Sequence, residues 1–327
     1  MLRYLLKRIL YLIPILFGVI LILFILNEIS PGDPAQMILG VDAKQEEIDA
    51  LHEKLGLDDP FLVRFFRYVG HSFTGDLGTS YRSGKPVLDE LMVRFPVSLI
   101  FAVGAVLLGV LFGVPLGIIS ALKQYTWVDS ALIVFSMALM AIPGFCLALF
   151  GILLFSVKWG VLPTSGIETW KGYVLPMAVI MLTVMSTNIR VTRTTMLDVM
   201  RQEYVKTARA KGQKERIVVF RHMVRNTLIP LVSQIGYDFG NQLGGALIIE
   251  TVFGVPGVGK YIADAITSRN YPSALGGVFV LAVVCSLINL ILDLLYAFVD
   301  PRLKTTLILD NIKRGRKKVR RAEHGEV

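Results

Sequence analysis

The sequence has little charge, few cysteines and few histidines. Asp, Glu, Lys and Arg make up 18% of its 327 residues, whereas soluble domains usually carry about 25%. The two cysteines, Cys146 and Cys285, lie in apolar runs, and the four histidines are far apart, so neither a disulfide framework nor a metal cluster is predicted. No H-E-x-x-H, G-x-S-x-G or C-x-x-C motif occurs, which removes the main sequence signs of metallopeptidases, serine hydrolases and dithiol redox proteins.

The sequence is instead rich in apolar residues, which make up 54% of it and give a mean hydropathy of +0.61. Six stretches approach or exceed the ~20 residues that a membrane helix needs. They are 9–26, 95–122, 130–157, 172–189, 228–252 and 275–299. Lipid offers no partners to backbone N–H and C=O groups, so these spans are expected to be helices. No A-x-A cleavage pattern follows the first stretch, which favours an uncleaved helix over a signal peptide.

The basic residues divide unequally between the two sides of these spans. The N-terminus, the 122–129 link, the 190–225 segment and the part after 299 hold 23 of the 34 Lys and Arg. That side carries a net +15, the other side −4 and the spans −2, which gives the total of +9. The positive-inside rule places the basic side, with both termini, in the cytoplasm.

The charge and hydropathy patterns divide the chain into four parts. They are an N-terminal tail with the first helix (1–30), an external segment (31–95), a five-helix core (96–299) and a basic cytoplasmic tail (300–327). The core includes a long cytoplasmic loop at 190–227. Within the external segment, the spacing of apolar residues over 46–55 predicts an amphipathic helix. The fold class predicted is all-α, with six transmembrane helices.

The cytoplasmic loop contains two helix-forming stretches on either side of Gly212. A glycine at this position can end the first helix with a left-handed cap. The second stretch leads into the fifth span, where Pro230 falls in the first turns. Such an elbow suits docking into a groove of a soluble partner, or lying as a basic helix on anionic lipid.

The loop resembles the cytoplasmic loop of binding-protein-dependent ABC import permeases. That family has E-A-A, three residues, G, nine residues and I-x-L-P, whereas this chain has Lys206-Thr207-Ala208, three residues and Gly212, with Pro230 18 residues later. The longer form, with A-R-A-K-G and R-N-x-L-x-P, resembles the dipeptide, oligopeptide and nickel subfamily, and its first (B-type) permease most of all. Four other pieces fit the same subfamily in order: 30–34, 75–80, 252–259 with 269–272, and Asp300-Pro301-Arg302.

The resemblance implies a type I ABC importer permease of the prokaryotic inner membrane. Such a permease pairs with a second, homologous permease, above two ATPase subunits that bind ATP and Mg²⁺, and receives cargo from an external binding protein. The chain itself is then neither an enzyme nor a cofactor protein. The resemblance places the ATPase-coupling contact at Glu203, Thr207, Ala208, Arg209, Ala210, Lys211 and Gly212.

Two further sets of residues are candidate sites. Polar residues inside the fourth and fifth spans either line a translocation pathway or serve helix packing; they are Ser186, Asn188, Asp238, Asn241 and Gln242. External turn residues are candidates for docking the binding protein; they are Gly75, Asp76, Gly78, Ser80, Pro256 and Gly257.

Several other interpretations are weaker. The 254–260 stretch has the G-x4-G-K spacing of a phosphate-binding loop, but Tyr261 stands where the Mg²⁺-binding Ser or Thr is required. Asp238 and Asp293 lack the sequence context of intramembrane aspartyl proteases. The basic tail at 313–321 fits anionic lipid better than nucleic acid. The predicted cargo is a di- or oligopeptide; nickel chelates, glutathione, oligosaccharides and a stand-alone secondary transporter are alternatives.

Overall fold

The computed structural model describes residues 2–29, 33–40 and 43–299, and helices make up most of this part. Its β-structure is limited to one isolated bridge between Thr79 and Pro86. The predicted all-α fold is therefore confirmed. The predicted basic tail, with Asp300-Pro301-Arg302, lies outside the described residues, as do Ser30, Pro31 and Gly32.

Five long helices dominate the chain: α1 (Leu2–Ile29), α5 (Val87–Leu122), α8 (Lys171–Met200), α11 (Arg225–Val252) and α13 (Tyr271–Val299). Shorter helices lie between them: α2 (Pro34–Leu39), α3 (Gln45–Leu55), α4 (Phe61–Phe73), α6 (Trp127–Ala141), α7 (Gly144–Gly151), α9 (Glu203–Ala210), α10 (Glu215–Ile217) and α12 (Val258–Thr267). Two π-helical segments, η1 (Ile152–Lys158) and η2 (Val218–Val224), complete the order. The amphipathic helix predicted at 46–55 is α3.

Four helical stretches are long and apolar enough to cross a membrane: Leu10–Ile29, Val87–Leu122, Lys171–Met200 and Tyr271–Leu292. A fifth span results if α6 is counted together with the α7–η1 segment. The predicted span at 228–252 lies in α11, which is not among these candidates in the part of the chain that was described. Polar residues such as Asp238, Asn241 and Gln242 lower its apolarity. The count of six spans stays a prediction.

The predicted third span, 130–157, is sharply bent. Trp127–Ala141 and Gly144–Lys158 meet at an angle of 97°. The bend lies at Ile142, which is extended with φ −89° and ψ 121°. A residue that precedes proline is pushed out of the α region, and Pro143 has no N–H to continue the helix. The proline therefore explains the break.

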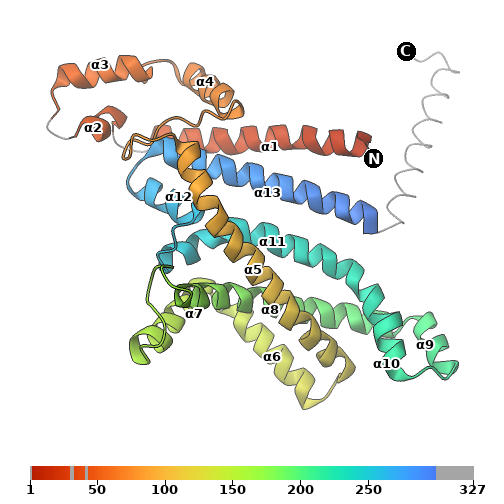
Figure 1. Cartoon of the computed structure of the whole chain (residues 1–327). Coiled ribbons are helices and arrows are strands. Elements are labelled where there is room, and N and C mark those ends of the chain that lie inside the picture. Colours follow the sequence, from red (N-terminus) through yellow and green to blue (C-terminus); the bar gives the residue numbers. More distant parts are fainter. Residues whose placement is uncertain (1, 30–32, 41–42, 300–327) are drawn as a thin grey trace, which may run out of the picture.

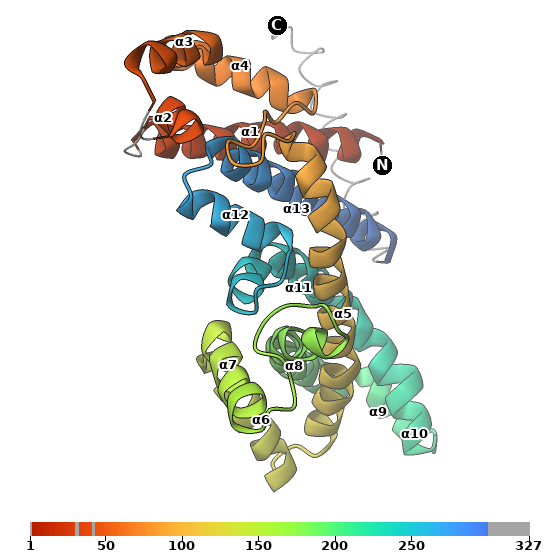
Figure 2. The ribbon, with the colours of Figure 1, turned by 60° about the vertical axis from the view of Figure 1, so that its left-hand side comes forward.

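The helices separate the segments that were predicted to lie on opposite sides of the membrane. In Figure 1 the N-terminus, α9, α10 and the end of α13 lie toward the right, whereas α2, α3 and α12 lie at the left. In both views α5 runs from the α1–α13 pair to the group formed by α6, α7 and α8 (Figures 1 and 2). We refer to the end that carries α2, α3 and α12 as the α3 end.

Three buried apolar clusters hold these helices together. The first joins α1, α4, α12 and α13 around Phe24, Phe65 and Phe279. The second joins α5, α8 and the end of α11. The third, which we call the elbow core, joins the end of α8 to α9 and η2 through Met196, Val205, Ala208, Val218, Val219 and Met223, with Ala121 of α5.

Glycines allow α5 to pack closely on α8. A Cβ atom at Gly109 would lie 2.6 Å from a Val184 methyl carbon, and one at Gly113 would lie 2.8 Å from the backbone oxygen of Met185. At Gly117 it would lie 2.6 Å from Cβ of Thr192. The three glycines are four residues apart on one helix face, a small-residue pattern that is typical of close helix contacts in membranes. The spacing is visible in the sequence, although its role was not predicted.

Candidate functional site

The predicted pathway residues Asn188 and Asp238 come together between α8 and α11. The Asn188 side-chain amide donates to Oδ2 of Asp238 at 2.6 Å and to the Val184 carbonyl at 2.9 Å. Gln234, one turn before Asp238, donates to its other oxygen at 2.8 Å. Asp238 is only 4% exposed and Asn188 is fully buried. The side-chain partners of Asp238 among the described residues are thus neutral amides.

This cluster also contains polar atoms without partners. Oδ1 of Asn188 and Oγ1 of Thr192 are buried and have no hydrogen-bond partner in the described structure. Buried polar atoms are nearly always paired, and an exception calls for an explanation such as an absent water, ion or ligand. The Asn188–Asp238 site can therefore accept further hydrogen bonds, and its carboxylate can take a cation.

The other predicted pathway residues are placed differently. The Ser186 hydroxyl is buried and donates to the Thr183 carbonyl of its own helix at 2.7 Å. Asn241 is exposed on the isolated chain and Gln242 is half-buried. The Ser186 hydroxyl is thus hydrogen-bonded within its own helix, whereas the exposed Asn241 side chain can face a partner or a pathway. The side chain of Asp293 lies outside the part that the structure describes.

A second buried carboxylate, Asp129, ties three helices together and was not predicted as a site. Arg193 contacts both its oxygens, with Nε at 2.6 Å from Oδ1 and Nη2 at 2.8 Å from Oδ2. The Ser120 hydroxyl donates to Oδ1 at 2.6 Å, and the Tyr125 N–H donates to Oδ2 at 3.1 Å. This clamp joins the end of α5 and the start of α6 to α8. The sign of this clamp in the sequence is Arg193, an arginine in the part of the fourth predicted helix that leaves the membrane.

The predicted coupling segment forms helix α9 and the turn after it. Val205 and Ala208 are buried in the elbow core. The remaining predicted residues, which are Glu203, Thr207, Arg209, Ala210, Lys211 and Gly212, are exposed. Ala208 therefore faces its own chain, and the other residues form one free surface.

Gly212 ends α9 in the way that the sequence predicts. Its φ of +72° lies in the left-handed region, which glycine enters without a steric penalty. Its N–H donates to the Arg209 carbonyl at 2.9 Å, and the next N–H, of Gln213, reaches the Ala208 carbonyl at 3.4 Å. No heavy atom lies within 4 Å of a Cβ built at Gly212. A substitution here would meet backbone strain but no steric clash.

The charges on this surface are partly paired within the chain. Arg209 contacts Glu215 at 2.6 Å across the turn, and Lys206 contacts Glu203 at 2.8 Å. The hydrogen bond from Arg209 lowers the pKa of the Glu215 carboxyl. An exposed pair of this kind contributes little to stability, so Arg209 can exchange Glu215 for a carboxylate of a partner.

The predicted docking turn at 75–80 is a glycine turn with an exposed acid. Gly75 and Gly78 have φ of +87° and +78°. Asp76, whose side chain is 61% exposed, accepts the Gly78 N–H at 3.0 Å and contacts His71 at 2.9 Å. The hydrogen bond with His71 lowers the pKa of Asp76. Asp76 and the two glycines are accessible to a partner.

Ser80 instead holds the turn to the chain. It is 3% exposed, and its hydroxyl accepts the Asn270 amide at 2.8 Å. The Asn270 side-chain oxygen accepts the Tyr81 N–H at 3.0 Å. Two stretches that carry the subfamily resemblance, 75–80 and 269–272, therefore lie side by side, and Ser80 is a structural residue of this contact.

The 254–260 loop is organised by a carboxylate of the same chain. Glu250 accepts the Ser98 hydroxyl at 2.6 Å and the Lys260 N–H at 3.0 Å, and Ser98 accepts the Val258 N–H at 2.8 Å. A Cβ atom at Gly257 would overlap the Glu250 carboxylate. The Lys260 N–H is thus taken by a carboxylate of the same chain, whereas a phosphate-binding loop directs such N–H groups at phosphate. Of the predicted docking residues here, Pro256 is exposed and Gly257 is buried.

Comparison with known proteins identifies the family. Residues 113–305 match the family described as binding-protein-dependent transport system inner membrane component, and residues 1–102 match the N-terminal part of such membrane components. The chain is similar to the glutathione transport system permease protein GsiC of Escherichia coli (strain K12), with 37% identity over 304 residues, 93% of this chain and 99% of that one. The Salmonella typhimurium protein of the same name is 38% identical over the same shares.

Solved structures support the same fold. The inward-facing MetNI methionine ABC transporter has a TM-score of 0.55 and 16% identity, over 64% of this chain and 96% of that chain. An amino acid ABC transporter has a TM-score of 0.50 and 14% identity, over 64% and 94%. The chain is therefore a multi-pass permease subunit of the bacterial inner membrane that belongs to the binding-protein-dependent ABC importers, in the dipeptide, oligopeptide and nickel subfamily.

Proposed function

We propose that this chain forms half of the translocation pathway of an ATP-driven importer for short peptides, with a homologous permease as the other half. This proposal rests on the similarity, along 93% of the chain, to permeases whose name specifies glutathione transport. Glutathione is itself a tripeptide, so the peptide class includes it. Nickel chelates and oligosaccharides stay as alternative cargoes for the same architecture.

The Asn188–Asp238 site supports a cargo with a cationic group. A peptide at neutral pH carries an α-ammonium group, which a carboxylate and amide oxygens can bind. Asp238 is paired with neutral amides, and Asn188 keeps an unused oxygen. We therefore assign these two residues to the pathway and leave Ser186 to helix packing.

The exposed surface of α9 supports docking of an ATPase subunit. A short helix with small and basic residues can lie in a groove of a soluble domain. Its opposite face is packed into the elbow core with α8 and η2, and η2 continues directly into α11. A displacement of α9 would thus be transmitted to both helices that carry Asn188 and Asp238. Two such ATPase subunits would bind ATP and Mg²⁺.

The α3 end supports contact with an extracytoplasmic binding protein. The exposed residues Gly75, Asp76, Gly78 and Pro256 belong to two turns at this end. Ser80 and Gly257 are buried beneath these turns and keep their shape. The charge distribution places this end outside the cytoplasm.

Reconstitution tests the proposal. Liposomes that contain both permeases and both ATPases, with the binding protein outside, are expected to accumulate labelled glutathione or a dipeptide only when ATP is inside. Vesicles with the purified chain alone are the control. Accumulation by this chain alone, without ATP, would instead support a stand-alone secondary transporter.

A further inference from the structure

The segment between α9 and α11 has a free face that the proposed ATPase contact does not use. In this segment Val218, Val219 and Met223 are buried in the elbow core. The residues between and beside them are exposed, and we call five of them the η2 face: Arg216, Ile217, Phe220, Arg221 and Arg225. Helix α9 turns its own buried residues toward the same core. The free surface of α9 and the η2 face therefore lie on different sides of the elbow core.

The elbow core places the η2 face at the level of the membrane surface. Ala121 belongs to this core and is the last residue but one of the candidate span Val87–Leu122. Met196, near the end of the candidate span Lys171–Met200, is buried in the same core. Its Sδ lies 3.1 Å from Oγ1 of Thr227 in α11. The η2 segment thus packs against the ends of two membrane helices, away from the α3 end (Figure 1) and on the side that the charge distribution places in the cytoplasm.

The three arginines of the η2 face have no acidic partner. Between 213 and 228 the sequence has one acidic residue, Glu215, and its carboxylate contacts Arg209 at 2.6 Å. The three arginines form no ion pair within the described ranges of the chain. Basic residues next to a membrane span attract anionic lipid, and a guanidinium can bind a phosphate group through two N–H donors.

Exposed apolar side chains stand among these arginines. Phe220 is 68% exposed and Ile217 is 44% exposed. Leu228, which follows in α11, is 45% exposed. Phenylalanine and leucine together with basic residues are typical of helices that lie at the surface of a bilayer, with the apolar groups below the headgroups. The composition of the η2 face therefore agrees with its position at the ends of the spans.

We propose that the η2 face binds an anionic phospholipid of the inner leaflet. The lipid phosphate would bind Arg221 and Arg225, and the Phe220 ring would lie among the upper parts of the acyl chains. Because η2 continues directly into α11, this contact would hold the inner end of the helix that carries Asp238 at the membrane surface. The proposal uses other residues than the ATPase contact and does not depend on the identity of the cargo.

Photo-crosslinking from position 220 tests the proposal on the assembled importer, in nanodiscs with equal amounts of phosphatidylglycerol and phosphatidylcholine. Phe220→p-benzoylphenylalanine places the reactive group on the η2 face, and mass spectrometry identifies each adduct by its mass. We expect phosphatidylglycerol adducts to exceed phosphatidylcholine adducts about fivefold or more. Arg221→Gln combined with Arg225→Gln should make the two adducts equally abundant. Lys206→Gln combined with Lys211→Gln, on α9, removes the same charge and should leave the preference unchanged.

The outcomes separate lipid from protein as the partner. Equal amounts of the two lipid adducts without the arginine substitutions, or adducts mainly with an ATPase subunit, would overturn the proposal. Tyr204→p-benzoylphenylalanine, at a side chain of α9 that is 41% exposed, is expected to crosslink to the ATPase instead. A failure at position 204 would count against the proposed ATPase contact and would leave the lipid result at position 220 unaffected.

Discussion

Two aspartates are almost equally buried in the helix bundle but have different partners. Asp129 is 3% exposed and Asp238 is 4% exposed. Asp129 faces a guanidinium on both oxygens and accepts two further hydrogen bonds, whereas Asp238 receives side-chain hydrogen bonds from neutral amides. Burial alone therefore does not indicate the role of a carboxylate in this bundle.

The difference in partners suggests a difference in role. The Asp129–Arg193 clamp neutralises its own charge and fixes the ends of α5, α6 and α8 beside the elbow core. The Asn188–Asp238 site holds a carboxylate whose side-chain partners in the described part of the chain are amides, at a point where α8 meets α11. Ionisable residues inside a membrane usually mark substrate or ion pathways, and Asp238 has no arginine clamp of the kind that gives Asp129 a structural role. We therefore treat the clamp as structural and the Asn188–Asp238 site as functional.

Removing the cation of the clamp should have the largest effect on stability. Arg193→Met leaves Asp129 buried and unpaired, which typically costs about 3–5 kcal/mol. We expect a large decrease in melting temperature in detergent and poor recovery of folded protein. Arg201→Met, at an exposed arginine near the end of the same helix, is the control. Equal stability of the two variants would show that the clamp is not structural.

Separating α5 from α8 should have the next largest effect. Gly117→Ala places a methyl group 2.6 Å from Cβ of Thr192, and overpacking of this kind costs about 1–3 kcal/mol. Gly244→Ala is the matched control, because a Cβ atom there meets no heavy atom within 4 Å. Chemical denaturation should show a loss for the first variant only. Helix propensity alone would make both variants more stable, so an equal gain in stability in both would show that close packing does not limit the α5–α8 contact.

Removing the charge of the Asn188–Asp238 site should lower the rate of transport much more than it lowers the stability of the fold. Asp238→Asn keeps the shape of the side chain, but one of the two amide donors then faces an NH2 group, so we expect a loss of about 1–3 kcal/mol, smaller than that of Arg193→Met. Uptake of peptide in the reconstituted importer should decrease at least tenfold. Uptake at the wild-type rate would show that Asp238 serves packing alone.

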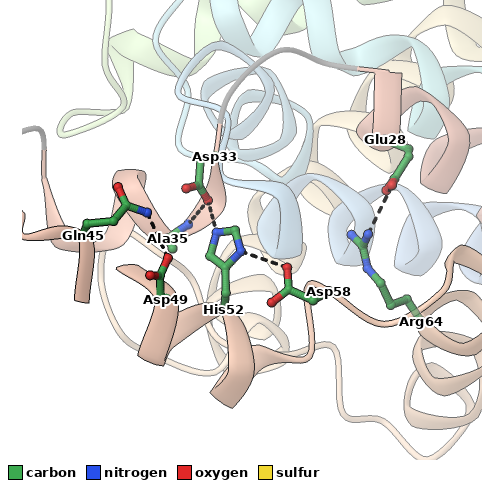
Figure 3. Close-up of polar contacts among 8 residues, drawn as sticks. All are labelled: Glu28, Asp33, Ala35, Gln45, Asp49, His52, Asp58 and Arg64. Atoms are coloured by element: carbon green, nitrogen blue, oxygen red, sulfur yellow. Dashed lines mark hydrogen bonds and ion pairs between the residues drawn. The ribbon is translucent and has the colours of Figure 1, made fainter. Parts of the chain in front are cut away.

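A half-buried histidine that contacts two aspartates at the α3 end should give the smallest effect, and this effect depends on pH. His52 contacts Asp33 at 2.7 Å and Asp58 at 3.2 Å (Figure 3). The hydrogen bond with Asp33 raises the pKa of His52 above its ordinary value. The stabilisation is therefore complete below about pH 6.5 and is lost as the pH rises through the folded-state pKa.

Hydrogen exchange of 45–58 measures this contribution. Protection should be greater at about pH 5.5 than at about pH 8.5. His52→Gln should abolish the difference, whereas His71→Gln should retain it. A pH dependence that persists in His52→Gln would assign the effect to another group.

The features that could be predicted from the sequence are those that depend on residues close together along the chain. The helical fold, the α3 helix and the cap at Gly212 follow from apolar spacing and from the φ that glycine allows. The bend in the predicted span at 130–157 follows from Pro143, which ends a helix at the residue before it, and it was not predicted. The α5 glycines were missed although their four-residue spacing is present in the sequence.

Contacts between distant segments could not be predicted. Asp129 and Arg193 are 64 residues apart, and Ser98 and Glu250 are 152 apart, so neither pair has a local pattern. Asn188 and Asp238 were both predicted as pathway candidates, because they are polar groups inside apolar helices. Their contact with each other could not be predicted and is seen in the structure alone.

The central claim is that the α9 surface and Gly212 couple ATP hydrolysis to transport, and the ratio of peptide imported to ATP hydrolysed tests it most directly. In reconstituted vesicles, Gly212→Val forces a β-branched residue into φ +72° and should lower that ratio at least tenfold. Gly212→Asn, which tolerates the left-handed conformation, should keep it near the wild-type value. A wild-type ratio in Gly212→Val, with the full complex assembled, would contradict the account.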